Sequence, residues 1–206
     1  MNVNEVFMHT AGGKKVYPYA MTVDQVDIKT ISRHLACQSR WLGATEHRFL
    51  KDRISYSVAE HSVYVSDFVA RELGRPDLAF DALMHDAAEA YIGDMIRPLK
   101  YSPDFHDVFK ALEDKVERVI AQKFHLTYPF APEIKVADNA VCMAEWEQIV
   151  PRNPDEQWGA DVIKQGVIIK AAPIGIAMLH PYEAYELFME RFNSLYQHNV
   201  SWGEAA

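Results

Sequence analysis

The sequence predicts an all-α protein, a compact helical bundle with room for a small β-hairpin at the N-terminus. Apolar residues recur at helical spacing over most of the chain. The main strand signal, over 14–19, follows the turn signal Gly12-Gly13. The 206 residues are 49% hydrophobic and 12% aromatic, which suits one folded domain with a sizeable core. We expect a single domain over 1–206, composed of an extended lead-in (1–24), a helical core (25–150) and a loop-rich segment followed by a C-terminal helix (151–206).

The first helix is expected soon after the lead-in. Asp24 or Asp27 is placed to cap it, because a carboxylate accepts hydrogen bonds from the free N–H groups of a first helical turn. The helix runs to about Cys37. The polar and charged residues 42–56 that follow are expected to form a loop.

Helical periodicity is clear in 57–73, where apolar residues and His61 share one face. Gly74 and Pro76 are the stop and start residues that separate this helix from the next, predicted over 77–91. Gly93 and Pro98 are then expected to break the chain. Further helices are predicted over 103–124, with Glu113, Lys115 and Glu117 facing solvent, over 131–150, and over 180–196 after a loop-rich stretch with four prolines.

Composition excludes several classes of function. The net charge is −8 and the pI about 5.6, so a long nucleic acid is not an expected partner. No apolar run approaches the roughly 20 residues that span a bilayer, and no secretion signal is visible, so a cytoplasmic protein without membrane contact is expected. The two cysteines, Cys37 and Cys142, lack a CxxC spacing and are interpreted as buried, unreactive thiols.

The residues that indicate chemistry are His61, the adjacent pair His85-Asp86, and Asp138. His61 and Asp138 lie on apolar helix faces and therefore point inward. An ionised carboxylate in such a place costs several kcal/mol unless a cation compensates it. Imidazole and carboxylate together suit first-row transition ions, so one shared ion explains the set.

Each of these residues also has a structural interpretation. His61 alone is compatible with a hydrogen-bonded core histidine, and His85-Asp86 with a pair on a helix surface. Asp138 is within reach of Lys135 or Arg152.

The ordered pattern resembles a known superfamily. The segments 58–62 (VAEHS), 85–89 (HDAAE), Gly93-Asp94 and 136–138 (VAD) are similar to the H…HD…D pattern of HD-domain metal-dependent phosphohydrolases. Within it the chain resembles bacterial 5′-deoxynucleotidases and phage dATP triphosphohydrolases. The similarity runs from about Ile31 to Trp146.

This resemblance implies a compact HD-domain bundle whose divalent metal ion is bound by His61, His85, Asp86 and Asp138. Mn, Co, Zn and Mg are all candidates. The family places a carboxylate at Glu89 near the attacking water or the leaving group, and Asp94 matches a second one that works in proton transfer. A partner to a ligand histidine (Glu89) and a loop cap (Asp94) are the structural alternatives.

Four residues are expected to bind substrate. Arg40-Trp41 resembles a pair in the deoxynucleotidases whose Arg binds phosphate and whose Trp packs where a 2′-hydroxyl would stand. Pro98-Leu99-Lys100 resembles the stretch whose Lys neutralises the phosphate. A surface Arg, a core Trp and a solvated Lys are the alternatives. The insert 42–56 is longer than expected between Arg-Trp and the first ligand histidine, so it could reshape the pocket.

Two forms of a deoxynucleotide hydrolase follow from the resemblance. The sequence favours a dNTP triphosphohydrolase, dATP-preferring, that releases deoxynucleoside and triphosphate. Lys51, Arg53, Arg97 and Lys100 could supply the positive charge that the additional phosphates need. The alternative is a 5′-nucleotidase that releases phosphate from a dNMP. An HD enzyme that cleaves cyclic nucleotides or (p)ppGpp and a non-catalytic module stabilised by metal are the remaining options.

A homo-oligomer is also expected. Such enzymes often assemble from identical subunits, and the last helix has enough apolar surface to contribute. From the sequence alone it could equally pack on its own core.

Overall fold

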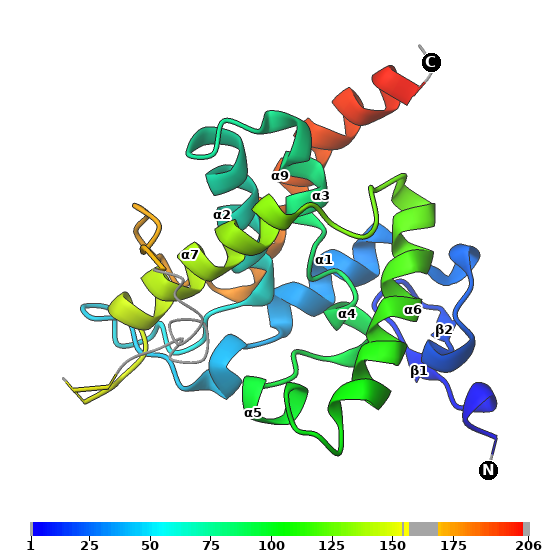
Figure 1. Ribbon diagram of the computed structural model, residues 1–206, viewed down its shortest axis with the longest axis horizontal. Coiled ribbons are helices and arrows are strands. Elements are labelled where there is room, and N and C mark those ends of the chain that lie inside the picture. Colours follow the sequence, from blue (N-terminus) through cyan, green and yellow to red (C-terminus); the bar gives the residue numbers. More distant parts are fainter. Residues whose placement is uncertain (1, 154, 157–168, 204–206) are drawn as a thin grey trace.

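The computed structural model describes residues 2–153, 155–156 and 169–203, and it confirms the all-α class. Helices fill most of Figure 1, and a small hairpin lies beside α6 near the N-terminus. Its strands β1 (Met8–His9) and β2 (Lys15–Val16) pair antiparallel. The second strand is shorter than predicted because the 3₁₀ turn η2 (Pro18–Ala20) begins at a proline.

The lead-in continues through 3₁₀ turns into the first helix. After η1 (Val3–Glu5) and η2, the turn η3 (Val23–Gln25) contains Asp24. The cap of α1 (Ile28–Cys37) is Asp27, whose carboxylate accepts from the backbone N–H of Thr30. The chain then forms η4 (Arg40–Gly43) and enters the insert.

The central helix, α2 (Val58–Arg71), begins where the hydrophobic pattern predicts. Its N-cap is Ser57, whose hydroxyl accepts from the N–H of Glu60. The turn η5 (Pro76–Leu78) follows and leads into the next helix.

The predicted continuous helix over 77–91 is wrong. The chain forms α3 (Ala79–Leu83) and α4 (Glu89–Ile92), with a tight turn over 84–88 between them. Bonds to the residue three back replace the α-helical ladder there, for example from the Ala87 N–H to the Met84 carbonyl. Helix propensity is high in this segment, so the turn is imposed by tertiary structure. It carries His85 and Asp86, which therefore lie off any helix.

The second half of the chain adds one unexpected helix. Pro98, predicted as a breaker, lies in the first turn of the short α5 (Arg97–Lys100), a position where its missing N–H has no helical partner to lose. Glu113 is buried, against the prediction that it faces solvent, while Lys115 is exposed. The remaining helices agree with expectation: α6 (His106–Phe124), α7 (Pro132–Gln148) and α9 (Pro181–Gly203).

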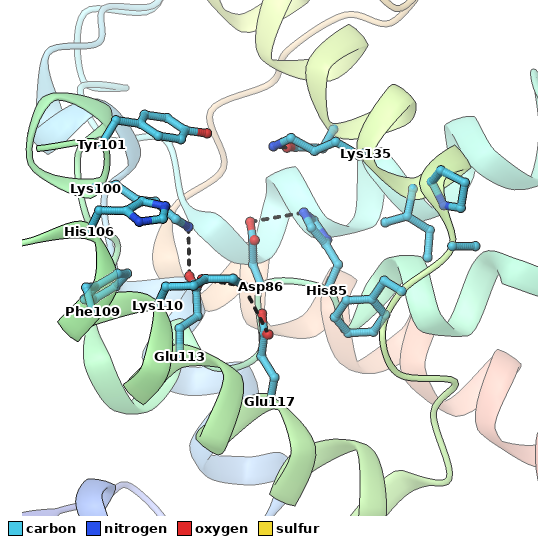
Figure 2. A pocket seen from close by; sticks show the side chains of 15 residues that line it. His85, Asp86, Lys100, Tyr101, His106, Phe109, Lys110, Glu113, Glu117 and Lys135 are labelled. Atoms are coloured by element: carbon cyan, nitrogen blue, oxygen red, sulfur yellow. Dashed lines mark hydrogen bonds and ion pairs between the residues drawn. The ribbon is translucent and has the colours of Figure 1, made fainter. Parts of the chain in front are cut away.

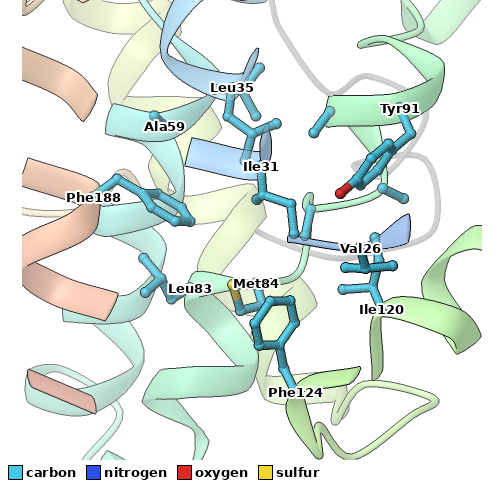
Figure 3. Packing of buried hydrophobic residues seen from close by; sticks show 14 of the residues in the cluster. Val26, Ile31, Leu35, Ala59, Leu83, Met84, Tyr91, Ile120, Phe124 and Phe188 are labelled. Atoms are coloured by element: carbon cyan, nitrogen blue, oxygen red, sulfur yellow. The ribbon is translucent and has the colours of Figure 1, made fainter. Parts of the chain in front are cut away.

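The core surrounds α2. On one side, α2 packs with α1, α3 and α9, and Figure 3 shows Phe188 of α9, Leu83 of α3 and Ile31 of α1 converging there with Phe124 of α6. On the other side, Val65 packs against α7. Helices from both halves of the sequence thus fix the orientation of α2.

The prediction that both cysteines are buried holds for one of them. Cys142 is buried, but Cys37 is exposed. Phe188 and Phe192 of α9 lie in the core of their own chain. No helix in the described ranges combines the length and the apolar character that crossing a membrane requires. Much of the predicted loop-rich segment, 154 and 157–168, lies outside the described residues.

Candidate metal centre and nucleotide site

The four predicted metal ligands come together from three parts of the chain. His61 is in the second turn of α2, His85 and Asp86 are in the turn between α3 and α4, and Asp138 is in α7. The Nε2 atom of His61 lies 3.6 Å from Asp86 Oδ2 and 3.3 Å from Asp138 Oδ1. The Nε2 atom of His85 lies 3.2 Å from Asp86 Oδ2. His61, His85 and Asp86 lie close enough to share one ion, and Asp138 joins His61 in a second, overlapping group.

The two histidines are held by their other ring nitrogens. His85 Nδ1 lies 2.8 Å from the Ala82 carbonyl oxygen, which can only accept, so Nδ1 carries the proton. His61 Nδ1 lies 2.5 Å from Glu145 Oε1 and donates in the same way. Both Nε2 atoms are buried and have no hydrogen-bond partner among the described residues. Nitrogens oriented in this manner fit metal ligation, and they do not fit a core histidine whose hydrogen bonds are satisfied.

The two ligand carboxylates are held ionised. Burial by itself raises the pKa of Asp86, but His85 and His61 outweigh it and hold the pKa well below its usual range. Burial likewise opposes ionisation of Asp138, and His61 and Lys135 more than offset it. Lys135 Nζ lies 2.6 Å from Asp138 Oδ2, so the ion pair that was the structural alternative for Asp138 is present. With side chains 20% and 13% exposed, neither Asp86 nor Asp138 is a surface residue.

Cys142 is a donor that the sequence interpretation did not place here. Its Sγ could complete a second ligand group with His61 and Asp138. Burial and the charge of Asp138 raise the pKa of the thiol well above its usual value. A protonated thiol is a poor metal ligand, and this one donates to Asp138 Oδ1 at 3.3 Å. The group of His61, His85 and Asp86 is therefore better suited to a divalent ion than the group that contains Cys142.

Two more carboxylates lie beside the predicted ligands. Burial, followed by the charges of Asp86 and Asp94, raises the pKa of Glu89 well above its usual value. Burial also raises the pKa of Asp94, and Arg40 opposes that effect. Glu89 is therefore suited to carry a proton at neutral pH while Asp86 is ionised, which is the division that acid–base chemistry requires.

Arg40 and Trp41 are tied to α7 by one carboxylate. Glu145 Oε2 accepts from Arg40 Nε at 3.2 Å and from the indole Nε1 of Trp41 at 2.9 Å. Arg40 Nη1 lies 3.6 Å from Asp86 Oδ2. Arg40 is therefore no surface residue, since its side chain is 11% exposed and it reaches the predicted metal ligands.

A cavity of about 500 Å³ opens beside these groups. Its lining includes two predicted metal ligands, Asp86 and Asp138, and all six residues predicted to act on substrate, namely Arg40, Trp41, Glu89, Asp94, Pro98 and Lys100. A second cavity of about 330 Å³ shares Asp86, Lys100, Tyr101, Lys135 and Asp138 with the first. Figure 2 shows Asp86 in the middle of the residues that line this second cavity. His85 and Lys135 lie on one side of it, and Lys100 and Glu113 lie on the other.

Lys100 is partnered inside the site. Its Nζ donates to Glu113 Oε1 at 2.8 Å, and the neighbouring negative charges raise the pKa of the ammonium group although burial opposes this. The side chain is 32% exposed, so it is neither a freely solvated lysine nor a buried one. Lys100 remains charged and borders both cavities.

The insert 42–56 lies away from both cavities. Its two ends are held together, because the Arg40 N–H donates to the Tyr56 carbonyl at 2.8 Å and the Val58 N–H to the Gln38 carbonyl at 3.1 Å. Among the described residues that line the two cavities, none belongs to the insert. Arg53 instead binds Glu183 and the Met178 carbonyl. The expectation that the insert reshapes the pocket finds no support in this geometry.

The residues that sequence analysis missed are Glu145, Cys142 and Glu113. Cys142 and Glu145 follow Asp138 by four and seven residues, so all three lie on one face of α7. This spacing was a usable signal. Glu113 gave none, because its position in α6 is compatible with solvent in the sequence pattern.

Comparisons with known proteins identify the family of this chain. A family model described as 5′-deoxynucleotidase YfbR-like matches residues 39–141, which contain all four predicted ligands. An uncharacterized protein of Escherichia coli, YfdR, is 32% identical over 92% of this chain and 95% of its own length. An uncharacterized protein of Rhodobacter capsulatus is 33% identical over 60% of this chain and 63% of its own. The chain belongs to the 5′-deoxynucleotidase YfbR-like family of HD-domain phosphohydrolases.

Proposed function

We propose that this protein is a divalent-metal-dependent 5′-nucleotidase that hydrolyses deoxynucleoside monophosphates to deoxynucleoside and phosphate. The observation that carries the proposal is the pair of unpartnered histidine Nε2 atoms, which converge with Asp86 and Asp138 beside a cavity of nucleotide size. Membership of the 5′-deoxynucleotidase YfbR-like family supports it.

The metal ion is assigned to His61, His85, Asp86 and Asp138. When bound, it supplies Lewis-acid activation of the phosphate and of a water molecule. Two imidazoles favour Mn, Co or Zn over Mg, which prefers an oxygen cage. All ligand assignments in this site are proposals.

The protein side chains then divide the remaining work. Arg40 and Lys100 bind phosphate oxygens from the cavity wall. Asp94 accepts a proton from the attacking water as its oxygen bonds to phosphorus. Glu89 gives a proton to the 5′-oxygen as the bond from phosphorus to that oxygen breaks, so a neutral deoxynucleoside leaves. Trp41 lies in the same cavity and is proposed to pack against the sugar where a 2′-hydroxyl would stand.

The charge balance of the site favours a monophosphate over a triphosphate. A triphosphate brings two further anionic groups that need cations. Apart from Lys100, which is assigned to the phosphate that is attacked, the lysines around the cavities pair with carboxylates, Lys110 with Asp114 at 2.8 Å and Lys135 with Asp138 at 2.6 Å. Of the four cations expected to serve the β and γ phosphates, Lys51 and Arg53 pair with Glu46 and Glu183 away from both cavities, whereas Arg97 and Lys100 line the first cavity. The dATP triphosphohydrolase stays a prediction with less support.

A product assay separates these options. Metal-stripped protein is supplied with Mn, Co, Zn or Mg and with a panel of deoxynucleoside mono- and triphosphates and matching ribonucleotides. We expect deoxynucleoside and inorganic phosphate from the monophosphates, with ribonucleotides slower. Inorganic triphosphate released from dATP would replace the nucleotidase with the triphosphohydrolase. Turnover of only cyclic nucleotides or (p)ppGpp would overturn both, and the absence of any turnover would favour a non-catalytic metal-stabilised module.

A further inference from the structure

Glu145 contacts more parts of the site than any predicted catalytic residue does, although it is no predicted ligand itself. The side chain is fully buried in α7. Its Oε1 lies 2.5 Å from His61 Nδ1, and its Oε2 accepts from Arg40 Nε and from Trp41 Nε1. One carboxylate therefore joins a predicted metal ligand to the two predicted substrate residues. It lies beyond residues 39–141, the segment that matches the family.

The contact with His61 decides which nitrogen faces the metal. An ionised carboxylate can only accept, so it keeps a proton on Nδ1 and makes Nε2 the nitrogen that can offer a lone pair to a metal. Nε2 is the buried atom without a hydrogen-bond partner, and it faces Asp86 and Asp138. Reversing the hydrogen bond at Nδ1 would place the proton on Nε2, where the metal has to bind.

The contacts with Arg40 and Trp41 hold a strained piece of backbone. Trp41 and Leu42 both adopt left-handed conformations, with φ of 58° and 52°. Each such residue costs about 1–2 kcal/mol relative to the right-handed region, and two in succession persist only where surrounding contacts enforce them. The backbone bond from Arg40 to Tyr56 fixes one side of this turn. Glu145 fixes the side chains.

We propose that Glu145 is a positioning residue that sets the tautomer of His61 for metal binding and, through its other oxygen, the placement of Arg40 and Trp41 for substrate. The metal half of this proposal is independent of the substrate. The Arg-Trp half rests on the proposed nucleotidase function.

Glu145→Gln tests the metal half with little change in shape. The amide oxygen can keep accepting from Arg40 and Trp41, which turns the amide NH₂ towards His61 Nδ1 and forces that nitrogen to accept. We expect metal affinity to fall about 10–100-fold, the effect typical of losing the partner of a ligand histidine. Calorimetric titration of metal-stripped protein with Co or Zn measures it without any substrate. Glu147→Gln, two residues on and exposed, is the matched control and should bind as the wild type does.

Trp41→Phe tests the other half and keeps the proposal falsifiable if Glu145→Gln does not fold. It removes one donor to Oε2 and leaves His61 untouched. We expect metal affinity within about twofold of the wild type and a higher KM for a dNMP, with a smaller change in kcat. Unchanged metal affinity in a folded Glu145→Gln protein would overturn the metal half. An unchanged KM in Trp41→Phe, in an enzyme that turns over dNMPs, would overturn the substrate half. A chain that binds metal but hydrolyses no nucleotide would refute the proposed function while the calorimetric result stands.

Discussion

Asp86 and Glu89 lie three residues apart and are driven in opposite directions by their surroundings. His85 and His61 lower the pKa of Asp86 by more than burial raises it, so this pKa is held below its usual range. Glu89 is buried near Asp86 and Asp94, and its pKa is raised well above the usual value. One carboxylate is thus prepared to bind a cation and the other to carry a proton. The difference arises from neighbours that are distant in sequence.

The proton on Glu89 leads to a prediction about rate and pH. If Glu89 protonates the leaving 5′-oxygen, only its protonated form is active, so kcat falls as pH rises through its raised pKa. Glu89→Gln should lower kcat by about 10²–10⁴ and remove this alkaline limb. Metal affinity, measured by calorimetry, should stay near that of the wild type.

Asp94→Asn is the comparison variant for this experiment. It removes the proposed proton acceptor and should lower kcat without removing the alkaline limb. An alkaline limb that survives unchanged in Glu89→Gln would assign the proton donor to another group.

At the scale of elements, α2 does two tasks within one turn. His61 faces the predicted metal ligands, while Glu60 faces the segment that leads into α9. The carboxylate of Glu60 accepts from the backbone N–H groups of Ala177, Met178 and Leu179 and from the hydroxyl of Tyr64. A buried charge with four donors is compensated locally, so it serves to attach this segment rather than to bind a ligand.

Glu60→Ala should therefore be among the most destabilising single changes outside the apolar core. It leaves several backbone N–H groups without an acceptor, and each buried donor that loses its partner costs about 1–3 kcal/mol. We expect the free energy of unfolding to fall by roughly 3 kcal/mol or more in urea titrations of the metal-free protein. Tyr64→Phe, which loses one of the four bonds, should cost about 0.5–1.5 kcal/mol. Equal losses in the two variants would show that Glu60 does not hold the segment.

The insert 42–56 is an element whose removal should change little at the site. The His47 N–H donates to the Arg53 carbonyl at 3.2 Å, so these two residues close a loop whose tip is formed by residues 48–52. Phe49 at the tip is 78% exposed. Replacing Arg48–Asp52 with Asn-Gly supplies a two-residue turn that can join His47 to Arg53.

We expect this shortened chain to retain metal affinity and dNMP turnover within about twofold, as measured by calorimetry and phosphate release. The unmodified chain in the same buffer is the control. A loss of turnover at unchanged metal affinity would mean that the tip reaches the substrate, and the geometry of the two cavities would then give an incomplete picture of the pocket.

The sequence predicted the long helices correctly, for identifiable reasons. The apolar stripe of α2 and the carboxylate cap at Asp27 are local signals that the fold did not override. The turn at His85-Asp86 was missed because the segment around it has high helix propensity and the contacts that break the helical ladder are tertiary. The burial of Glu113 and the three-way role of Glu145 depend on side chains brought in from Lys100, Arg40 and His61, which no local pattern contains.

At the scale of the whole molecule, the last helix packs inward. Phe188 and Phe192 of α9 fill the core of their own chain, so they are not the apolar surface on which the predicted homo-oligomer would rest. Tyr182 of the same helix is 72% exposed. Self-association stays a prediction, and Phe188 and Phe192 would not contribute to its interface.

The metal centre joins regions that are far apart in the sequence. Its predicted ligands belong to α2, to the turn before α4 and to α7, so one ion would connect three parts of the fold. Without it, ionised Asp86 and Asp138 lie close together at low exposure, with histidines and Lys135 as their compensation. A ligand that binds only the folded chain stabilises it by about 2.7 kcal/mol at a hundredfold excess over its Kd.

Metal removal should therefore change stability as well as activity. For a chain of this length about 2–4 °C of Tm corresponds to 1 kcal/mol, so saturating Co or Mn should raise Tm over the EDTA-treated protein by roughly 5–10 °C. Differential scanning calorimetry measures this, with chelation also abolishing turnover. Asp138→Asn removes one ligand charge and should lose most of the metal-dependent shift, whereas Glu147→Gln on the same helix should keep it. If EDTA and metal give the same Tm in the wild type, the four residues do not form a divalent-metal site that links α2 to α7.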